Sequence, residues 1–173
     1  RRLLLLALQN EPSRHVRRKI SDAVAAISKL APWPQLLAVV QQLGTAKGSR
    51  DKQLSMYLLD KLAEHVGESL LVPGSRESVW ALISPILDAI GASGGDDEAR
   101  VSAGAAAEAL CSLLAATTEL PGPVALWATG LASAAAAARA LASDEGTNDE
   151  ACACIGALQR LAESHPSHFQ TCL

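Results

Sequence analysis

The chain has 173 residues, 49% of them hydrophobic, but it contains only three Trp, one Tyr and one Phe, so leucine and alanine must fill its interior. No stretch of useful length alternates apolar and polar residues, which excludes a strand-dominated fold and predicts an all-α protein. The net charge of −3 conceals a split: residues 1–61 hold eleven Lys and Arg against four Asp and Glu, whereas residues 62–173 hold four against fourteen. Stacked helices would present a basic end and an acidic end to a partner, unless these charges only solvate helix faces.

The four cysteines lack the spacing of a disulfide framework, and free thiols in a reducing compartment fit them best. They are Cys111, Cys152, Cys154 and Cys172. We find no signal peptide and expect no apolar run long enough to span a bilayer. Because the chain begins at Arg1 without a Met, we interpret it as a piece of a longer protein.

Residues 1–10 and 13–30 are predicted to form a first pair of helices around a break at Asn10–Pro12. Apolar residues at helical spacing predict the buried face of the second helix. This row consists of Val16, Ile20, Ala23, Val24, Ile27 and Leu30. The opposite, solvated face carries Arg14, Arg18, Ser21, Asp22 and Lys29.

Residues 33–43 and 50–67 form the second predicted pair, with Pro34 in a first turn and a loop over residues 44–49. Gly67 is expected to end the second of these helices as a C-terminal cap. Its buried side should hold Leu54, Tyr57, Leu58, Leu62 and Val66. The other side should present Lys52, Gln53, Met56, Asp60 and Glu64.

The third pair is predicted to begin at Ser75, a suitable N-cap, and Pro85 should kink or break its first helix. A loop over 91–95 precedes the acidic residues 96–98, which favour a helix start. The helix that follows extends to about Thr117 and is too rich in alanine for its buried face to be identified.

The fourth pair is predicted to start at Pro123 and to extend to about Leu141, followed by a polar loop over 143–148. Asn148 or Asp149 should cap the last helix, which ends at His165–Pro166. Its inward side chains should be Ile155, Leu158 and Leu161. Trp80 and Trp127 are expected in the core of the third and fourth pairs.

Comparable positions in the second helices, at Val16, Leu54, Val101 and Ala151, recur every roughly 40–50 residues, close to the period of HEAT and armadillo helix pairs. The predicted fold is therefore an α-solenoid of HEAT-type antiparallel pairs, a right-handed superhelix forming one array over 1–173. The pairs comprise residues 1–32, 33–72, 73–121 and 122–165, and residues 166–173 start a fifth. A single pair cannot bury its apolar face, so stacking is obligatory.

Three segments resemble the karyopherin-β (importin-β) family of nuclear transport receptors, above all its importin-4/importin-5-like branch. They are residues 3–29, with Arg17-Arg18-Lys19 and Asp22 at matching places, residues 33–43, with Trp33-Pro34, and residues 53–68. Residues 98–114 and 149–166 resemble the second helices of two further repeats. The resemblance covers essentially the whole chain, strongly over 1–70 and loosely afterwards.

The resemblance implies a superhelix whose second helices line a concave face that binds protein cargo and Ran-GTP. It also implies that the outer helices contact Phe-Gly nucleoporins, and that the protein shuttles between cytoplasm and nucleus through the nuclear pore. On this interpretation the protein acts by non-covalent binding. It is not an enzyme and uses no cofactor, metal or small-molecule substrate, and it has no membrane partner.

The candidate partner-binding residues are charged or polar side chains expected on the concave face. They are Arg14, Arg18, Asp22, Lys29, Lys52, Gln53, Asp60, Glu64, Asp97 and Arg100. The plainer interpretation is a solvated helix face with an internal Arg18–Asp22 pair that contributes only about 0.2–0.5 kcal/mol.

No pattern in the sequence indicates catalysis, because it has neither a Gly-rich phosphate loop after a strand nor a nucleophile elbow. His165, His168 and Cys172 could gather on one side of a helix, but they are one ligand short of a zinc site.

Two alternatives to transport remain open. One is a HEAT scaffold of the phosphatase-regulatory or tubulin-binding type. The other is a nucleic-acid-binding basic surface over residues 1–61, which we rank lower because aromatic stacking platforms are lacking there and the acidic remainder repels phosphate.

Overall fold

The computed structural model describes residues 1–30, 33, 35–93, 97–117, 123–143 and 145–170, with only the backbone of 90–93. Every regular element in these ranges is helical, which confirms the all-α prediction. The α-helices are α1 (Arg2–Asn10), α2 (Arg14–Leu30), α3 (Gln35–Gly44), α4 (Ser49–Leu70), α5 (Ser75–Ser93), α6 (Asp97–Ala115), α7 (Val124–Ala142) and α8 (Asn148–Ser164). Two short 3₁₀ helices, η1 (Glu145–Thr147) and η2 (Pro166–His168), precede and follow α8.

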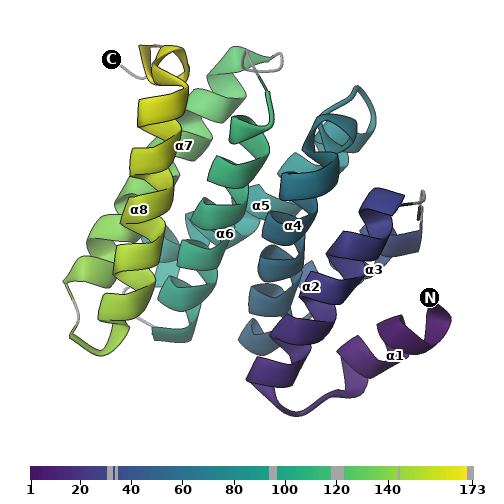
Figure 1. Ribbon diagram of the computed structural model, residues 1–173. Helices are drawn as coiled ribbons and strands as arrows, with labels where there is room; N and C mark the ends of the chain where they lie inside the picture. The colour runs from purple at the N-terminus through teal and green to yellow at the C-terminus, as the bar shows by residue number, and fades with distance from the viewer. Residues whose placement is uncertain (31–32, 34, 94–96, 118–122, 144, 171–173) are drawn as a thin grey trace.

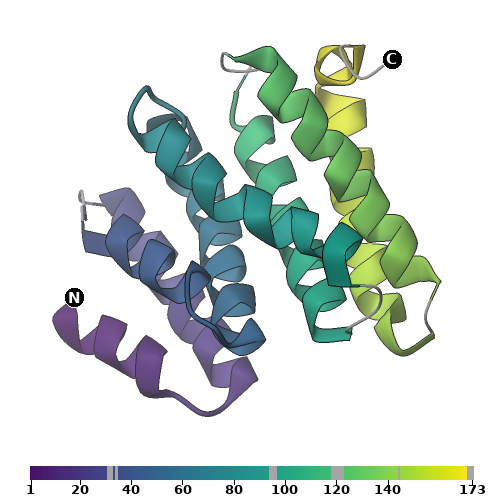
Figure 2. The same ribbon diagram turned by 180° about the vertical axis from the view of Figure 1, so that it is seen from behind.

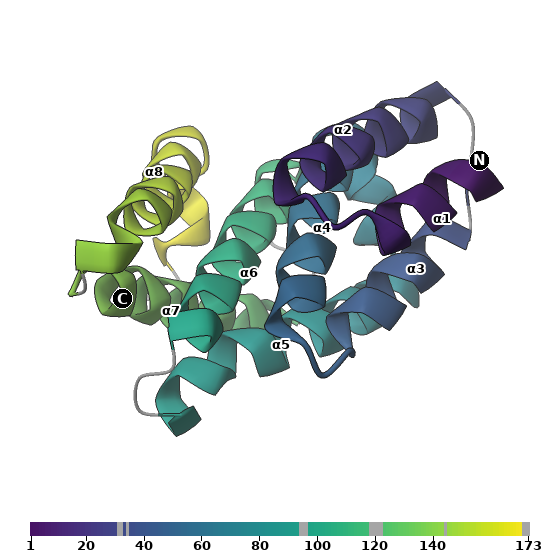
Figure 3. The ribbon, with the colours of Figure 1, turned by 90° about the horizontal axis from the view of Figure 1, so that it is seen from below.

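The helices form two layers. In one layer α2, α4, α6 and α8 lie side by side, each in contact with the next (Figure 1). The other layer contains α3, packed on α4, α5, packed on α6 and α7, and α7, packed on α8 (Figure 2). The first layer is curved, since α2 and α8 project to one side of α4 and α6, away from α3, α5 and α7 (Figure 3). This curvature makes one face of the layer concave.

Small residues on α6 allow it to contact four neighbours, namely α4, α5, α7 and α8. Its interior face is built mainly from alanine and leucine, which explains why no apolar stripe stands out in its sequence. The fully buried residues of this face include Ala103, Ala106, Ala107, Ala109, Leu110, Leu113 and Leu114. Alanine favours helix and permits close approach of neighbouring helices, so this composition suits the centre of the fold.

The aromatic contact between the third and fourth pairs depends on a glycine. Trp80 of α5 and Trp127 of α7 pack edge to face with ring centroids 5.3 Å apart, and Trp127 is fully buried, whereas Trp80 is half-buried. A Cβ at Gly130 would lie 2.8 Å from the Trp80 ring. Gly130 therefore provides the space for Trp80, and the core prediction is confirmed for Trp127 and only partly for Trp80.

The predicted buried face of α2 is confirmed only in part. Val24 is fully buried, and Ile20 and Ile27 are partly buried against the core. Val16 is 41% exposed and Leu30 is 84% exposed, and Ala23 also faces solvent. The other buried side chains of α2 are Arg17, Ser21, Ala25 and Ser28. The serines fit there because each hydroxyl donates within its own helix, Ser21 Oγ to the Arg17 carbonyl at 3.0 Å and Ser28 Oγ to the Ala25 carbonyl at 2.6 Å.

Helix α4 differs from its prediction at two points. Met56, expected on the polar side, is fully buried, because α4 contacts α2, α3, α5 and α6 and has little free surface. Gly67 is not a cap, since the helix continues to Leu70 with one non-helical residue at Val66. A Cβ at Gly67 would lie 2.5 Å from that of Ala116, so this glycine permits close packing.

Helix α5 extends through Pro85 to Ser93, so of the predicted kink or break at Pro85 the break is wrong, and so is the loop start at residue 91. Helix α6 begins at Asp97, with Asp97 and Glu98 in its first turn as predicted, whereas Asp96 lies outside the described residues.

The first helix of the fourth pair begins close to its predicted position, because α7 begins directly after Pro123.

The N-cap position of α8 is occupied by Thr147, not by Asn148 or Asp149, and its side chain makes no capping hydrogen bond. The 3₁₀ helix η1 occupies part of the predicted loop. Ile155, expected inward, is about half exposed, whereas Leu161 is buried. His165 ends the helix as predicted. Residues 166–168 form η2 rather than the start of an α-helix, and 171–173 lie outside the described residues.

Among the described helices, α7 is long and apolar enough to cross a membrane by length and composition, contrary to expectation. The core helix of a soluble protein passes the same test. In α7, Trp127, Leu131 and Leu141 are buried in the interior of the fold.

Candidate functional site

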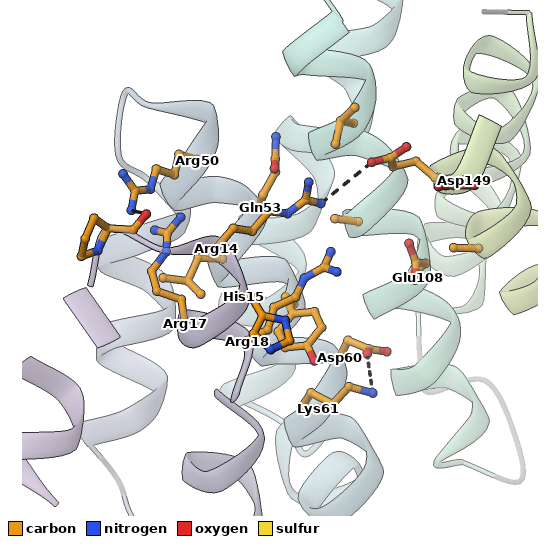
Figure 4. A pocket seen from close by; sticks show the side chains of 17 residues that line it. Arg14, His15, Arg17, Arg18, Arg50, Gln53, Asp60, Lys61, Glu108 and Asp149 are labelled. Carbon is orange, nitrogen blue, oxygen red and sulfur yellow. Dashed lines mark hydrogen bonds and ion pairs between the residues drawn. The ribbon is translucent and has the colours of Figure 1, made fainter. Parts of the chain in front are cut away.

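The concave face of the curved layer holds a groove of about 940 Å³. Side chains from α2, α4, α6 and α8 all line it, so each of the four helix pairs contributes to one site (Figure 4). Its charges are separated: arginines of α2 and α4 lie on one side, and Glu108, Asp149 and Glu150 of α6 and α8 lie on the other.

The basic side is built from Arg14, Arg17 and Arg18, whose spacings of three and four residues place them on one face of α2. Arg17 is only 5% exposed, and its Nη1 lies 3.9 Å from Asp51 Oδ1, too far for a hydrogen bond. Its Nε has no hydrogen-bond partner among the described residues. Burial, followed by the nearby charge of Arg50, lowers the pKa of Arg17.

Arg50 lies at the start of α4 and joins it to the turn between α1 and α2. Its Nη2 donates to the carbonyl oxygens of Glu11 at 2.8 Å and Pro12 at 2.6 Å. Because this turn leads directly into α2, the two bonds fix the position of the helix that carries Arg14 and Arg17. Arg50 thus orients the basic side and adds charge to it.

Polar contacts at the middle of the groove link α2 to α4. The Tyr57 hydroxyl donates to Asp22 Oδ1 at 2.8 Å, and the Arg18 guanidinium lies 5.1 Å from the centroid of the Tyr57 ring. Burial and the hydrogen bond to Asp22 raise the pKa of Tyr57 to about 12. Tyr57 therefore stays protonated at neutral pH and acts as a hydrogen-bond donor.

The floor of the groove continues along α4 to Asp60 and Lys61. Lys61 Nζ lies 3.2 Å from Asp60 Oδ2 and also pairs with Glu64. Burial lowers the pKa of Lys61, but the hydrogen bond to Glu64 and the charge of Asp60 outweigh it, so the net shift is upward. Asp60 in turn accepts a hydrogen bond from Ser112 Oγ of α6 at 2.5 Å, which links adjacent helices.

Glu108 is the unusual group of the acidic side. It projects from the alanine-rich face of α6 and has neither an ion pair nor a hydrogen bond among the described residues. Burial, reinforced by the charge of Asp60, raises the pKa of Glu108 to about 7, despite the opposing charges of Arg18, Arg160 and Lys61. A cation from a binding partner would therefore be favoured beside it.

The predicted partner-binding residues divide into two groups. Arg14, Arg18, Gln53 and Asp60 line the groove. Six do not line it, namely Asp22, Lys29, Lys52, Glu64, Asp97 and Arg100, although Asp22 accepts a hydrogen bond from Tyr57, which does. Of these, Glu64 pairs with Lys61, and Asp97 and Arg100 pair with each other at the start of α6.

Six charged residues that line the groove are not among the predicted partner-binding residues. They are Arg17, Arg50, Lys61, Glu108, Asp149 and Glu150. Arg17 could have been identified as a candidate binding residue from its spacing to Arg14 and Arg18 on the same helix. Glu108 could have been identified as a candidate because it is the one charged residue between Val101 and Ala109.

Of the described histidines and cysteines, His15 lines the groove and the others do not. His168 is buried with its Nε2 3.2 Å from the Leu114 carbonyl oxygen, and its ring stacks on His165, whereas Cys172 lies outside the described residues. Burial raises the pKa of Cys111, and that of Cys154 to about 12, so these thiols stay protonated. Within the described ranges, no group of three or more His, Cys, Asp or Glu is placed to hold a metal ion.

Comparison with protein-family models, with curated proteins and with solved structures finds no match for this chain.

Proposed function

We propose that the chain is part of a HEAT-type α-solenoid that binds a protein partner, without catalysis, in the groove formed by α2, α4, α6 and α8. The observation that carries the proposal is that charged side chains from all four helix pairs line one concave site. A partner that contacts four consecutive repeats is a typical ligand of a curved repeat array.

The arrangement of neighbours supports the solenoid part of the proposal. The second helices contact one another in chain order, from α2 to α4, α6 and α8, and most of their remaining contacts are made with the other layer. In a right-handed superhelix of this kind each pair supports only its neighbours, so small adjustments between pairs accumulate along the array. Such flexing would let the groove adapt to more than one partner.

The charge distribution favours a protein as the partner. The groove places Arg14, Arg17 and Arg18 opposite Glu108 and Asp149, so neither a polyanion nor a polycation would match it throughout. A protein segment of mixed charge can pair with both sides, and such complementarity provides specificity and speeds association. The acidic side also disfavours the nucleic-acid alternative.

In its more specific form, the proposal is a nuclear transport receptor that carries protein cargo and is regulated by Ran-GTP. The support for this form is the resemblance of residues 3–29, 33–43 and 53–68 to importins. Ran-GTP and cargo would compete for the concave face, Phe-Gly nucleoporins would contact the layer of α3, α5 and α7, and the protein would shuttle through the nuclear pore.

Retention of Ran on the immobilised chain tests this form. Ran loaded with a non-hydrolysable GTP analogue should be retained more strongly than Ran loaded with GDP. Equal retention of the two forms, or none, would contradict the transport role and leave a HEAT scaffold of another kind. A salt-sensitive mobility shift of a labelled RNA would favour the nucleic-acid alternative.

A further inference from the structure

We propose that the α2–α4 end of the groove is an anion subsite, formed by Arg14, Arg17 and Arg50, that binds an acidic side chain of the protein partner. This inference rests on the proposed function and specifies the chemistry of the bound segment.

Among the described residues, Arg17 has fewer partners than a buried guanidinium requires. It is 5% exposed, its Nε has no hydrogen-bond partner there, and the carboxylate that pairs with it, on Asp51, is 3.9 Å away. The Asp51 side chain is itself 43% exposed, so solvent weakens its attraction. A buried charge is ordinarily paired and hydrogen-bonded, so this site is incomplete without an additional anion.

Two further arginines lie at this end of the groove. Burial and the charges of Arg50 and Arg14 lower the pKa of Arg17, and they outweigh the opposing charges of Asp51 and Glu11. Arg50 is held in place by the carbonyl oxygens of Glu11 and Pro12 and cannot turn away without losing those bonds. An anion at this position would relieve the repulsion and accept hydrogen bonds from a guanidinium, whose planar donors match carboxylate and phosphate oxygens.

The charges along the rest of the groove restrict the kind of segment that can bind. The groove continues past the arginines to Glu108, Asp149 and Glu150, which would repel further negative charge. The fitting occupant is therefore a segment that is acidic at one end only, with neutral or basic residues towards α6 and α8. A uniformly acidic chain would satisfy the subsite and be repelled by the rest of the groove.

Fluorescence anisotropy with the full chain and labelled twelve-residue peptides tests this inference. The first peptide carries two glutamates at one end and two lysines at the other. The second has glutamine in place of both glutamates, the third has phosphoserine in their place, and the fourth is glutamate throughout. We expect the first peptide to bind about tenfold more tightly than the second, since a hydrogen bond to a charged group is lost. The fourth should bind more weakly than the first.

The third peptide distinguishes the two sources of the anion. Tighter binding of phosphoserine than of glutamate would assign the subsite to a phosphorylated side chain, and the reverse to a carboxylate. The inference is overturned if the first peptide does not bind, or if the first and second peptides bind equally. Equal binding with measurable affinity would leave the groove as a protein-binding site that recognises its partner elsewhere, so the proposed function would survive.

Two variants test whether the glutamates of the first peptide bind at the proposed subsite. Arg17→Met removes the donors and keeps an unbranched side chain of similar length, and Arg14→Gln changes an exposed residue that packs little. Each should reduce the affinity for the first peptide about tenfold and leave that for the second unchanged. Lys29→Gln is the matched control, because Lys29 is a cation of the same helix outside the groove. An equal loss in the control would show non-specific attraction to a basic helix and overturn the inference.

Discussion

Arg14 Nη2 lies 3.9 Å from Glu150 Oε1, so side chains of α2 and α8 meet across the groove although α4 and α6 lie between these helices. The contact is a consequence of the curvature of the layer. Both side chains keep substantial exposure, 55% for Arg14 and 29% for Glu150, so solvent screens the pair.

We therefore predict that the Arg14–Glu150 pair contributes little to folding. A double-mutant cycle of Arg14→Gln and Glu150→Gln, measured by urea unfolding, should give a coupling energy below about 1 kcal/mol. Asp149→Asn is the control, because Asp149 lines the same groove without pairing with Arg14. A coupling of several kcal/mol would indicate that this contact closes the array into a bundle.

Glu108 should make the stability of the protein depend on pH. Its pKa is raised from 4.5 to about 7 in the folded state, so the folded protein binds more protons than the unfolded chain between these values. The free energy of unfolding should therefore fall as pH rises from about 4.5 to about 7. Glu108→Gln should flatten this decrease and stabilise the protein at pH 8 by on the order of 1 kcal/mol.

The matched control for Glu108 is Glu163→Gln, an exposed acid of α8 that lies outside the groove. Urea unfolding of the three proteins at pH 4.5, 6 and 8 separates the effects. Parallel curves for the wild type and Glu108→Gln would show that Glu108 titrates normally and is not desolvated.

Tyr57→Phe removes the hydroxyl that donates to Asp22 between α4 and α2. We expect a loss of about 1 kcal/mol in the free energy of unfolding at pH 8, typical of one hydrogen bond. Because the folded-state pKa of Tyr57 is raised from 10.0 to about 12, this stabilisation is complete below pH 10 and is lost as pH rises towards 12. Urea unfolding at pH 8 and pH 11 measures both effects, and an equal difference at the two pH values would contradict the assignment.

Gly130→Ala should destabilise the protein although alanine is the better helix former. The added Cβ would lie 2.8 Å from the Trp80 ring, and we expect a cost of about 1–3 kcal/mol from overpacking. Gly156→Ala is the control in α8, because its nearest neighbour is the flexible end of Arg160, at 3.2 Å. That variant should be neutral or more stable by up to about 1 kcal/mol. Thermal unfolding compares the two, and equal effects would contradict the close packing of α5 and α7.

The all-α class and most helix boundaries could be predicted because apolar periodicity and the prolines and glycines between helices are local signals. The buried face of α2 could be predicted only in part, because Ser21 and Ser28 satisfy their hydroxyls within the helix and are buried, whereas Val16 and Leu30 are exposed. The role of Gly67 depends on Ala116, which is distant in sequence, so the turn-like signal was misleading.

The candidate site was also predictable only in part, because some of its residues are brought together by contacts between helices that are distant in sequence. Arg14, Arg18, Gln53 and Asp60 could be selected because helical spacing identifies the polar side of their helices. Glu108 stands out in the sequence as a charged residue within an alanine-rich run, but its place in one site with α2 could not be predicted. The same holds for Glu150, because the curvature of the layer brings α6 and α8 into one site with α2. Local patterns carry no information about that curvature.

The central claim is that the partner binds in the concave groove, and equilibrium binding of Ran-GTP to charge-reversal variants tests it most directly. We predict that Arg14→Glu combined with Arg18→Glu weakens binding at least about tenfold, while circular dichroism shows unchanged helix content. Arg139→Glu, on the exposed surface of α7 outside the groove, should bind as the wild type does. Unchanged affinity of the groove variant, or an equal loss in both variants, would contradict the account.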